Sequence, residues 1–290
     1  MTLDSAILLP GLALAPPGAQ PVLTIELGRV GAHHGAYVRA GPGWRAGPGL
    51  VTLDIPGIAR MQARDGRQLT VEVGDGATAG DAAAFAQCTG LGLLLHQRGE
   101  ILMRGTAVQV GDRAALLLGE PGVGASTLAM ALGRAGHALV ADDLCRITTA
   151  PDGALQVEAS RGSCQLWRKA IDALSLQERA GVRVRDGIDR FHVAPPRLAE
   201  GPVVLRDVIA LRDSTSAHPP GWSSLPPLKT AVMLYVSAYR QALVAPLGLE
   251  QAQFRAMAAL MRQVPVRTLS VPRALGRLPE TVAMLDGQWA

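Results

Sequence analysis

Short runs of alternating apolar and polar residues fill the first part of the chain. Clusters of Gly and Pro separate them, and such clusters end strands because Pro cannot donate to a strand ladder and Gly adopts turn conformations. The pattern predicts five short strands, at residues 22–27, 37–39, 51–54, 58–63 and 68–73. Asp65-Gly66 lies between the last two. An Asp-Gly pair in that place predicts a tight hairpin, because both residues tolerate positive φ angles.

A helical period follows the alternating runs. Apolar residues recur three or four positions apart at Ala84, Phe85, Cys88, Leu91 and Leu95. They predict one helix over 80–97 with Gly99 as its C-cap, because Gly readily adopts the left-handed conformation that ends helices. We therefore assign residues 1–98 to a small β-rich module that ends in a helix.

Strand-like and helix-like segments then alternate to the end of the chain. Predicted strands lie at 100–110, 113–118, 138–141, 155–160, 203–211 and 266–271. Predicted helices lie at 126–134, 166–173, 228–247, 249–263 and 279–285, and a polar loop containing prolines lies at 213–227. Such alternation is typical of the α/β class. We therefore predict an α/β domain over residues 99–290.

A glycine-rich stretch follows the strand predicted at 113–118. It reads GEPGVGAST and leads directly into a predicted helix. A strand, a G-x-x-x-x-G turn and a hydroxyl residue opening a helix form the layout of a nucleotide-binding P-loop. Its glycines let backbone N–H groups surround phosphates, and its hydroxyl ligates Mg²⁺. In this chain those parts are Gly119, Gly122, Gly124 and Ser126, followed by Thr127.

Two acids, Asp142 and Asp143, come directly after the next predicted strand. In a right-handed β–α–β unit both strands point the same way, so their carboxyl ends meet at one edge of the sheet. We therefore expect the two carboxylates to lie beside the phosphates. One would hold Mg²⁺ and the other would take the proton from an attacking hydroxyl.

The region from Gly119 to Asp143 resembles HPr kinase/phosphorylase and the HPr-kinase-related P-loop kinases. Its sequence, GEPGVGASTLAMALGRAGHALVADD, is similar to the family pattern GxxGxGKSTLAxALxxxGHxLVADD. Residues 54–73, 92–108 and 260–280 also resemble these relatives. The resemblance covers most of the chain, and it implies an HPr-kinase-like P-loop core behind the β-rich module.

This resemblance implies an ATP- and Mg²⁺-dependent kinase that phosphorylates a serine hydroxyl on a protein or peptide. Asp142 and Asp143 would supply the base and a metal contact, and Ser126 a second metal contact. The phosphate-binding residues would be Gly119, Gly122, Val123, Gly124, Ala125, Ser126 and Thr127. Homo-oligomers occur in the family, so a homo-oligomer is a further expectation for this chain.

Two positions depart from the family pattern. Arg104 stands where relatives usually have His, near the reacting phosphate, and Ala125 stands where the P-loop has its Lys. The missing ammonium would bridge the β- and γ-phosphates, and the loss of one such donor typically costs about 10²–10³ in rate. Three explanations of Ala125 stay open: a deliberate Lys→Ala change, natural loss of activity, or substitution by another cation. The candidate cations are Arg104, Lys169, Arg183, Arg185 and Arg190.

These departures leave two functions open, besides a structural domain whose loop is vestigial. One is the active kinase. The other is a catalytically impaired, nucleotide-binding regulatory partner, a pseudokinase whose N-terminal module recruits a client.

Composition indicates which binding partners and which cellular compartment to expect. The net charge of +4 comes almost entirely from arginines without a basic run, so we expect no nucleic-acid partner. The widely spaced Cys88, Cys145 and Cys164 favour a reducing, cytoplasmic setting. Four prolines interrupt the apolar stretch 6–25, which we therefore interpret as loop and strand rather than a membrane span.

Overall fold

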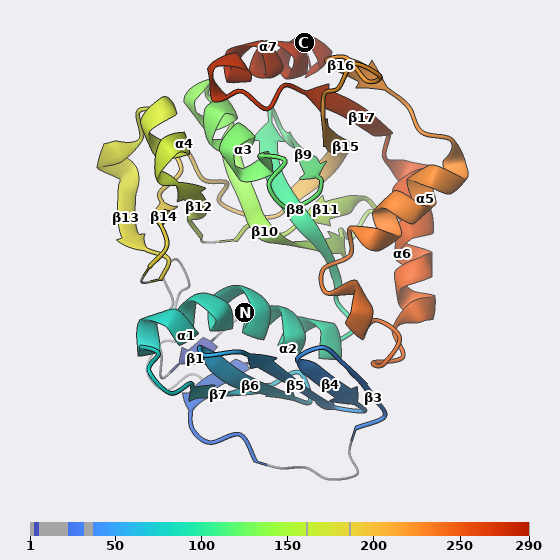
Figure 1. Ribbon diagram of the computed structural model, residues 1–290. Coiled ribbons are helices and arrows are strands. Elements are labelled where there is room, and N and C mark those ends of the chain that lie inside the picture. The colour runs from blue at the N-terminus through green and yellow to red at the C-terminus, as the bar shows by residue number, and fades with distance from the viewer. Residues whose placement is uncertain (1–2, 6–22, 32–36, 161, 186, 290) are drawn as a thin grey trace. The chain divides into compact units, whose positions relative to one another are not determined.

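The computed structural model describes residues 3–5, 23–31, 37–160, 162–185 and 187–289 (Figure 1). They form a mixed α/β protein that divides into two compact units. The first unit contains Met1–Leu102, Val184–Ile188 and Arg240–Gln253, and the second contains the remainder. Most of the apolar stretch 6–25 that we interpreted as loop and strand lies outside the described residues.

The first unit is built on one seven-stranded sheet in the order β1-β2-β7-β6-β5-β4-β3. Strands β1, β2 and β7 are parallel, and the others pair as antiparallel neighbours. Their bounds are β1 Leu3–Ser5, β2 Leu23–Leu27, β3 Arg39–Gly41, β4 Trp44–Gly47, β5 Leu50–Ile55, β6 Ala59–Arg64 and β7 Gln68–Val73. The sequence did not predict β1 or β4, because three or four residues are too few to display a period.

The predicted hairpin between β6 and β7 is confirmed. Asp65 and Gly66 have φ angles of +50° and +64°, as a two-residue turn of this hand requires. A side chain at Gly66 would also collide with Arg98, because its Cβ would lie 2.5 Å from Arg98 Cγ. Both the backbone conformation and the space therefore require glycine at this position.

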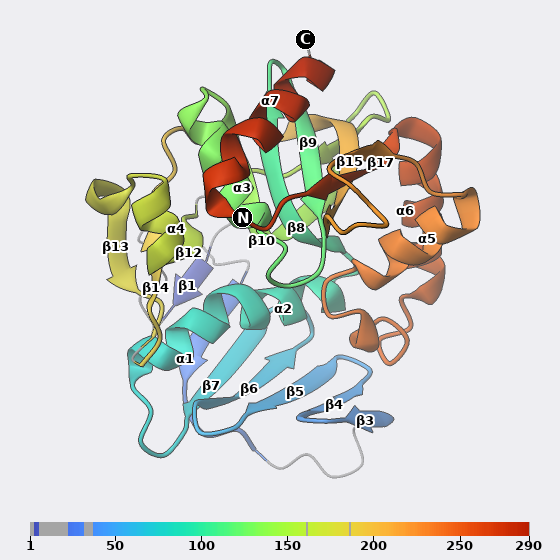
Figure 2. The same ribbon diagram turned by 45° about the horizontal axis from the view of Figure 1, so that its top comes forward.

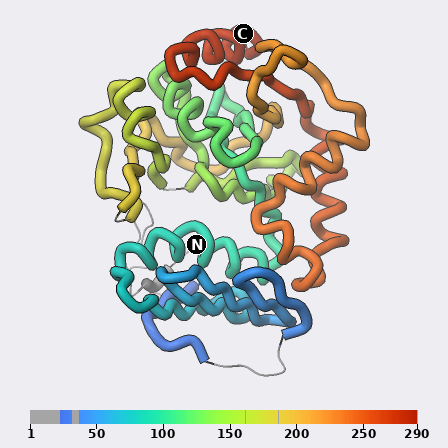
Figure 3. Tube along the Cα trace, in the orientation of Figure 1, coloured from blue at the N-terminus to red at the C-terminus, as the bar shows by residue number. Residues whose placement is uncertain are grey.

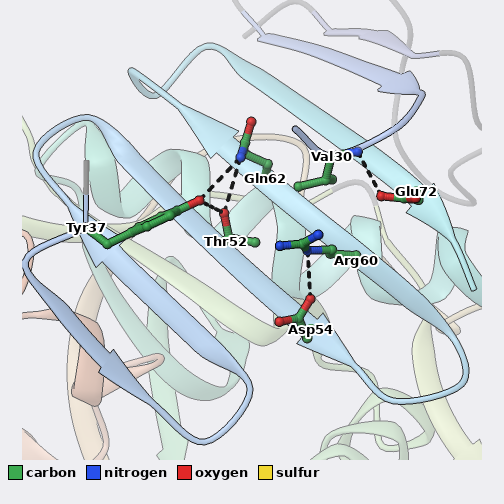
Figure 4. A network of polar contacts seen from close by, with 7 residues as sticks. All are labelled: Val30, Tyr37, Thr52, Asp54, Arg60, Gln62 and Glu72. Atoms are coloured by element: carbon green, nitrogen blue, oxygen red, sulfur yellow. Dashed lines mark hydrogen bonds and ion pairs between the residues drawn. The ribbon is translucent and has the colours of Figure 1, made fainter. Parts of the chain in front are cut away.

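Buried polar side chains link neighbouring strands of this sheet (Figure 4). Thr52 and Gln62 are almost fully buried, and Gln62 Nε2 donates to Thr52 Oγ1 across 3.3 Å. The hydroxyl of Tyr37 lies 2.5 Å from the same Oγ1. Because unpaired polar groups are costly when buried, this network fixes the register of β5 against β6.

The predicted helix over 80–97 forms, with one irregular turn. It consists of α1 (Ala79–Phe85), a π-helical turn at Ala86–Gly90, and α2 (Leu91–Gln97). Thr78 and Asp81 form a reciprocal capping box at its start. Gly99 has a φ of +74° just after its end, as predicted.

The main sheet of the second unit follows the order β11-β10-β8-β9-β15-β17-β16. Strand β11 also pairs with β15, so the first five strands form a closed ring of pairings. Their bounds are β8 Ile101–Val110, β9 Arg113–Leu118, β10 Ala138–Thr149, β11 Leu155–Val157, β15 Val203–Asp213, β16 Gly221–Ser223 and β17 Val266–Val271. Strand β15 is parallel to β9, and β11 is antiparallel to both β10 and β15, so β10 and β9 run the same way.

Helices cover this sheet. Figures 1 and 2 show α3 (Ala125–Arg134) packed beside α7 (Leu278–Trp289). Helices α5 (Pro227–Val236) and α6 (Glu250–Gln263) follow β16. Residues 164–193 hold a small antiparallel sheet, β12 (Cys164–Trp167), β14 (Arg190–Val193) and β13 (Ala180–Arg183), together with α4 (Arg168–Ala173). Figure 3 shows this segment in yellow-green near α3.

Several predicted boundaries in the second unit are wrong. Strand β10 does not end at residue 141 but continues to Thr149, and β11 ends at Val157. The predicted loop 213–227 contains β16, and residues 164–167 form β12 rather than the start of a helix. The helix predicted at 228–247 ends at Val236 because Arg240 adopts a left-handed φ of +48° and Ala238 pairs with Met103.

Candidate functional site

The glycine-rich loop connects the buried strand β9 to α3. Gly122 and Gly124 have φ angles of +93° and +98°, which other residues adopt only with strain. No atom lies within 4 Å of the Cβ position at either glycine, so no neighbouring side chain occupies the space there. Gly119 is required for a different reason, because its Cβ would lie 2.6 Å from Val123 Cγ1.

The first turn of α3 presents its backbone N–H groups without a side-chain cap. Its N-cap is Gly124, and the first intrahelical bond runs from Leu128 N–H to the Gly124 carbonyl at 2.8 Å. The side chains of Val123 and Ala125 pack against the apolar core of the unit. The amides of Ala125, Ser126 and Thr127 in this turn are therefore available to a ligand, whereas the Val123 N–H already donates to the Glu120 carbonyl at 3.1 Å.

Asp142 lies beside the first turn of α3, although it stands within β10 and not at the carboxyl end of that strand, where the sequence analysis expected it. Ser126 Oγ donates to Asp142 Oδ1 across 2.8 Å, and Thr106 Oγ1 donates to the same oxygen across 2.6 Å. The structure thus brings together Ser126 and Asp142, two residues that the sequence placed in one site. It is Ser126 rather than Thr127 that bonds to the acid.

Three further groups surround Asp142, and the sequence analysis did not identify them. Thr106 comes from β8, and both the backbone N–H of Gln165 and the thiol of Cys164 form hydrogen bonds with the Asp142 carboxyl. Both come from β12, in a region whose strands we did not predict. Only the alternation along β8 could have indicated Thr106, because it lies two residues after Arg104 on the same strand face.

The surroundings of Asp142 change its acidity. Burial of the carboxyl group raises the pKa of Asp142, and the hydrogen bonds from Thr106 and Ser126 oppose that rise only in part. Burial, and then the negative charge of Asp142, raise the pKa of the Cys145 and Cys164 thiols well above the usual range. Both cysteines are therefore neutral donors rather than nucleophiles: the Cys164 thiol donates to Asp142, and the Cys145 thiol donates to the Gly105 carbonyl at 3.3 Å.

Asp143 differs from Asp142 in both exposure and backbone. Its side chain is exposed, and its φ of +65° interrupts the extended conformation in the middle of β10. Asp tolerates the left-handed region better than most residues, so the pair can occur within a continuous strand. The two acids are close enough for the charge of Asp143 to raise the pKa of Asp142.

The cations considered as replacements for the missing lysine lie in different places. The Arg183 guanidinium lies 3.8 Å from the Asp189 carboxylate and over the ring of Phe191. These two contacts hold Arg183 at the small sheet. Arg190 donates twice to the Gln165 carbonyl at 3.3 Å. It thereby positions the residue whose N–H bonds to Asp142. Lys169 is exposed on α4, and Arg104 is exposed on β8.

A cavity of about 670 Å³ lies beside the first half of the loop. Gly119, Glu120, Pro121 and Val123 line it on the loop side. Arg104 lines it as well, but Lys169 and the arginines at 183 and 190 do not. The side chain of Thr268, buried and with no hydrogen-bond partner at Oγ1, lies on its lining.

The donors near the loop fit a Mg²⁺ ion better than a metal held by protein alone. Within the described part of the chain, no group of three or more His, Cys, Asp or Glu side chains gathers to hold a metal. Mg²⁺ commonly uses one or two protein oxygens and takes its other ligands from phosphates and water. The hydroxyl of Ser126 and the carboxylate of Asp142 are such oxygens.

Comparisons with known proteins find similarity among solved structures. No protein-family model matches the chain, and no curated protein matches it. No helix in the described residues is both long and apolar enough to cross a membrane. Among solved structures, the HPr(Ser) kinase/phosphatase from Coxiella burnetii matches with a TM-score of 0.33 and 14% sequence identity. The match covers 64% of this chain and 95% of that chain, and at this TM-score it does not establish a common fold.

Proposed function

We propose that the protein binds Mg²⁺–ATP at the glycine-rich loop and transfers the terminal phosphoryl group to a hydroxyl group. The observation that carries this proposal is the 2.8 Å hydrogen bond between Ser126 Oγ and Asp142 Oδ1. It joins the first hydroxyl of α3 to the acid on β10, and these are the two protein ligands that P-loop enzymes supply to Mg²⁺. The open glycine turn before them supports the same assignment.

Each residue of the site then has a definite role. The amides of the loop and of the first turn of α3 bind the phosphates, because a helix N-terminus favours negative charge. Ser126 and Asp142 hold Mg²⁺, which neutralises the charge that develops on the phosphates. Asp143, exposed beside Asp142, accepts the proton of the acceptor hydroxyl.

The cavity beside the loop supports a protein or peptide as the acceptor. The wall that α5 contributes is mostly apolar, with Leu228, Val232 and Val236 exposed to solvent to 77%, 54% and 59%. An apolar wall next to the phosphates suits a hydroxyl residue flanked by apolar neighbours, which favours a serine in a peptide segment over a small polar substrate.

A second function is favoured by Ala125. Without an ammonium between the β- and γ-phosphates, the loop binds nucleotide but transfers the phosphoryl group slowly or not at all. In that case the protein is a nucleotide-dependent partner protein rather than an enzyme.

Nucleotide titration with and without Mg²⁺ tests the common part of both functions. We expect ATP to bind with a Mg²⁺-dependent affinity, and both Ser126→Ala and Asp142→Asn to remove that dependence. Absence of Mg²⁺-dependent binding at millimolar ATP would contradict both functions.

Transfer of radiolabelled γ-phosphate to serine-containing peptides then separates the kinase from the partner protein. Asp143→Asn is the variant that should bind ATP but transfer nothing.

A further inference from the structure

Cationic side chains gather around the cavity beside the loop. Four of them line it, at Arg104, Arg212, Lys229 and Arg273, against two acids, Glu120 and Asp213. The excess of positive charge lies next to the first residues of the glycine-rich loop. A ligand in this cavity is therefore expected to carry negative charge at its loop end.

Two of these cations already have partners. Arg273 Nε lies 2.9 Å from Asp213 Oδ2 in an ion pair. Arg212 donates to the hydroxyls of Ser270 at 2.8 Å and Ser223 at 3.1 Å. Both guanidinium groups thus stabilise the ends of β15 and β17 and are occupied in the protein itself.

Arg104 and Lys229 differ from them. Both side chains are exposed, and neither has a hydrogen bond or ion pair with a described residue. Holding two cations on one cavity costs free energy through their mutual repulsion unless an anion lies between them. They are therefore the two cations of the cavity that are available to a ligand.

Helix α5 sets the spacing of these two residues. Lys229 lies in its first turn, on the face that also carries Val232, Met233 and Val236 toward the cavity. At the other end of the helix, the Arg104 N–H donates to the Ser237 carbonyl at 2.8 Å. Eight residues of helix span about 12 Å, so the two flexible side chains can converge on one group between the ends of α5.

Arg104 also connects the cavity to the acid site. It shares one face of β8 with Thr106, two residues later and about 7 Å along the strand. Thr106 in turn bonds to Asp142 across 2.6 Å. The long side chain of Arg104 can thus reach a terminal phosphate that lies near Ser126, Asp142 and Asp143, where the proposed function places it.

We propose that Arg104 and Lys229 hold the terminal phosphate of the bound nucleoside triphosphate, in place of the ammonium that Ala125 lacks. This inference rests on the proposed function, since it requires nucleotide on the loop. An arginine binds phosphate oxygens through two parallel N–H groups, and a lysine adds a compact positive charge. Together they supply from β8 and α5 the charge that a P-loop lysine supplies from within the loop.

The ratio of ATP to ADP affinity tests the inference, because only ATP carries the terminal phosphate. Isothermal titration in Mg²⁺ would compare wild type with Lys229→Met and Arg104→Gln. We expect each substitution to weaken ATP binding about 10-fold to 100-fold, as for loss of a charged hydrogen bond, and to change ADP binding much less. Lys229→Arg, which keeps the charge, should retain most of the ATP affinity.

Matched controls come from the same chain. Lys169→Met removes the other lysine of the sequence, and Arg113→Gln removes an exposed arginine at the far end of β9. Both controls should leave the ATP to ADP ratio unchanged. In an Ala125→Lys background, the restored ammonium should reduce the effect of Lys229→Met to a small fraction of its value in wild type.

The outcomes separate the inference from the proposed function. If wild type binds Mg²⁺–ATP and the two substitutions behave like their controls, the inference is wrong and the proposed function stands. Equal losses for ATP and ADP would also overturn it, because they would locate the cations away from the terminal phosphate. If wild type binds no nucleotide, both are wrong.

Discussion

The two sides of the glycine-rich loop differ in how completely their polar groups are paired. On the side of β10, the Asp142 carboxyl accepts hydrogen bonds from Thr106, Ser126 and the backbone of Gln165. On the side of α5, Arg104 and Lys229 face a cavity without a partner among the described residues. The acid side is preorganised before any ligand binds, whereas the cation side becomes complete only with an anion.

The contrast between the two sides indicates where the absence of a lysine at position 125 has its effect. Ala125 is the first residue of α3 and its side chain packs on the core. The acid side is therefore intact without a lysine at this position. In the proposed function, the alanine affects only the positive charge next to the terminal phosphate. Substitutions on each side should therefore have separable consequences.

Restoring the loop lysine should have the largest effect. In a variant that lacks both Arg104 and Lys229, we expect Ala125→Lys to raise the rate of phosphoryl transfer by about 10²–10³, because one preorganised donor to the developing charge contributes that much. Transfer of labelled phosphate to an acceptor peptide measures it. Ala125→Met, similar in length but uncharged, is the control and should give no increase. An equal gain from both would attribute the effect to packing.

Removing the acid should have the next largest effect, on the opposite side of the loop. Asp142→Asn should lower the affinity for Mg²⁺ in the nucleotide complex by about 100-fold or more. Thr106→Val should have a smaller effect, about 10-fold, because it removes a hydroxyl that orients the Asp142 carboxylate. Titration of Mg²⁺ at fixed ATP measures both. If Thr106→Val has the larger effect, the hydroxyl rather than the carboxylate holds the metal.

The conformation of the loop between the two sides can be tested through Gly124. Its φ of +98° disfavours any side chain, so Gly124→Ala should reduce the free energy of unfolding by about 1–2 kcal/mol. Denaturant unfolding measures this loss. Gly201→Ala is the matched control, since a Cβ there meets no atom within 4 Å and its φ is not positive. Similar losses at both positions would show that the turn is not under conformational constraint.

The smallest predicted effect concerns the small sheet that supports the acid side. His192 is buried beside Ser163, and burial followed by the charge of Arg190 lowers the pKa of His192. The unfolded chain therefore binds a proton at higher pH than the folded one. This contribution to stability is present above the ordinary histidine pKa of about 6.5 and is lost as the pH falls through it toward the lowered folded value.

Thermal unfolding between about pH 7.5 and pH 5 measures this effect in the window where histidine titrates. The melting temperature of wild type should fall more steeply on acidification than that of His192→Gln. His218→Gln, at an exposed position, is the control and should follow wild type. Parallel curves for all three proteins would contradict the prediction.

Local patterns predicted the parts of the fold that depend on neighbouring residues. The Asp65-Gly66 hairpin, the helix near 80–97 and the strand–loop–helix unit around Gly119 all formed where short-range sequence signals placed them. Boundaries failed where distant segments meet. Strand β10 continues past Asp142, and α5 ends at Val236 because Ser237 and Ala238 pair with β8.

Short-range signals in the chain place glycines, a hydroxyl and two acids in the order that is typical of a phosphate-binding loop, because backbone φ and helix propensity act over a few residues. The groups that surround this motif are known only from the folded protein. Thr106, Cys164 and Gln165 reach Asp142 from other strands, and Arg104 and Lys229 share a cavity although 125 positions separate them. Such contacts depend on the pairing and packing of whole elements, for which a linear pattern carries no signal.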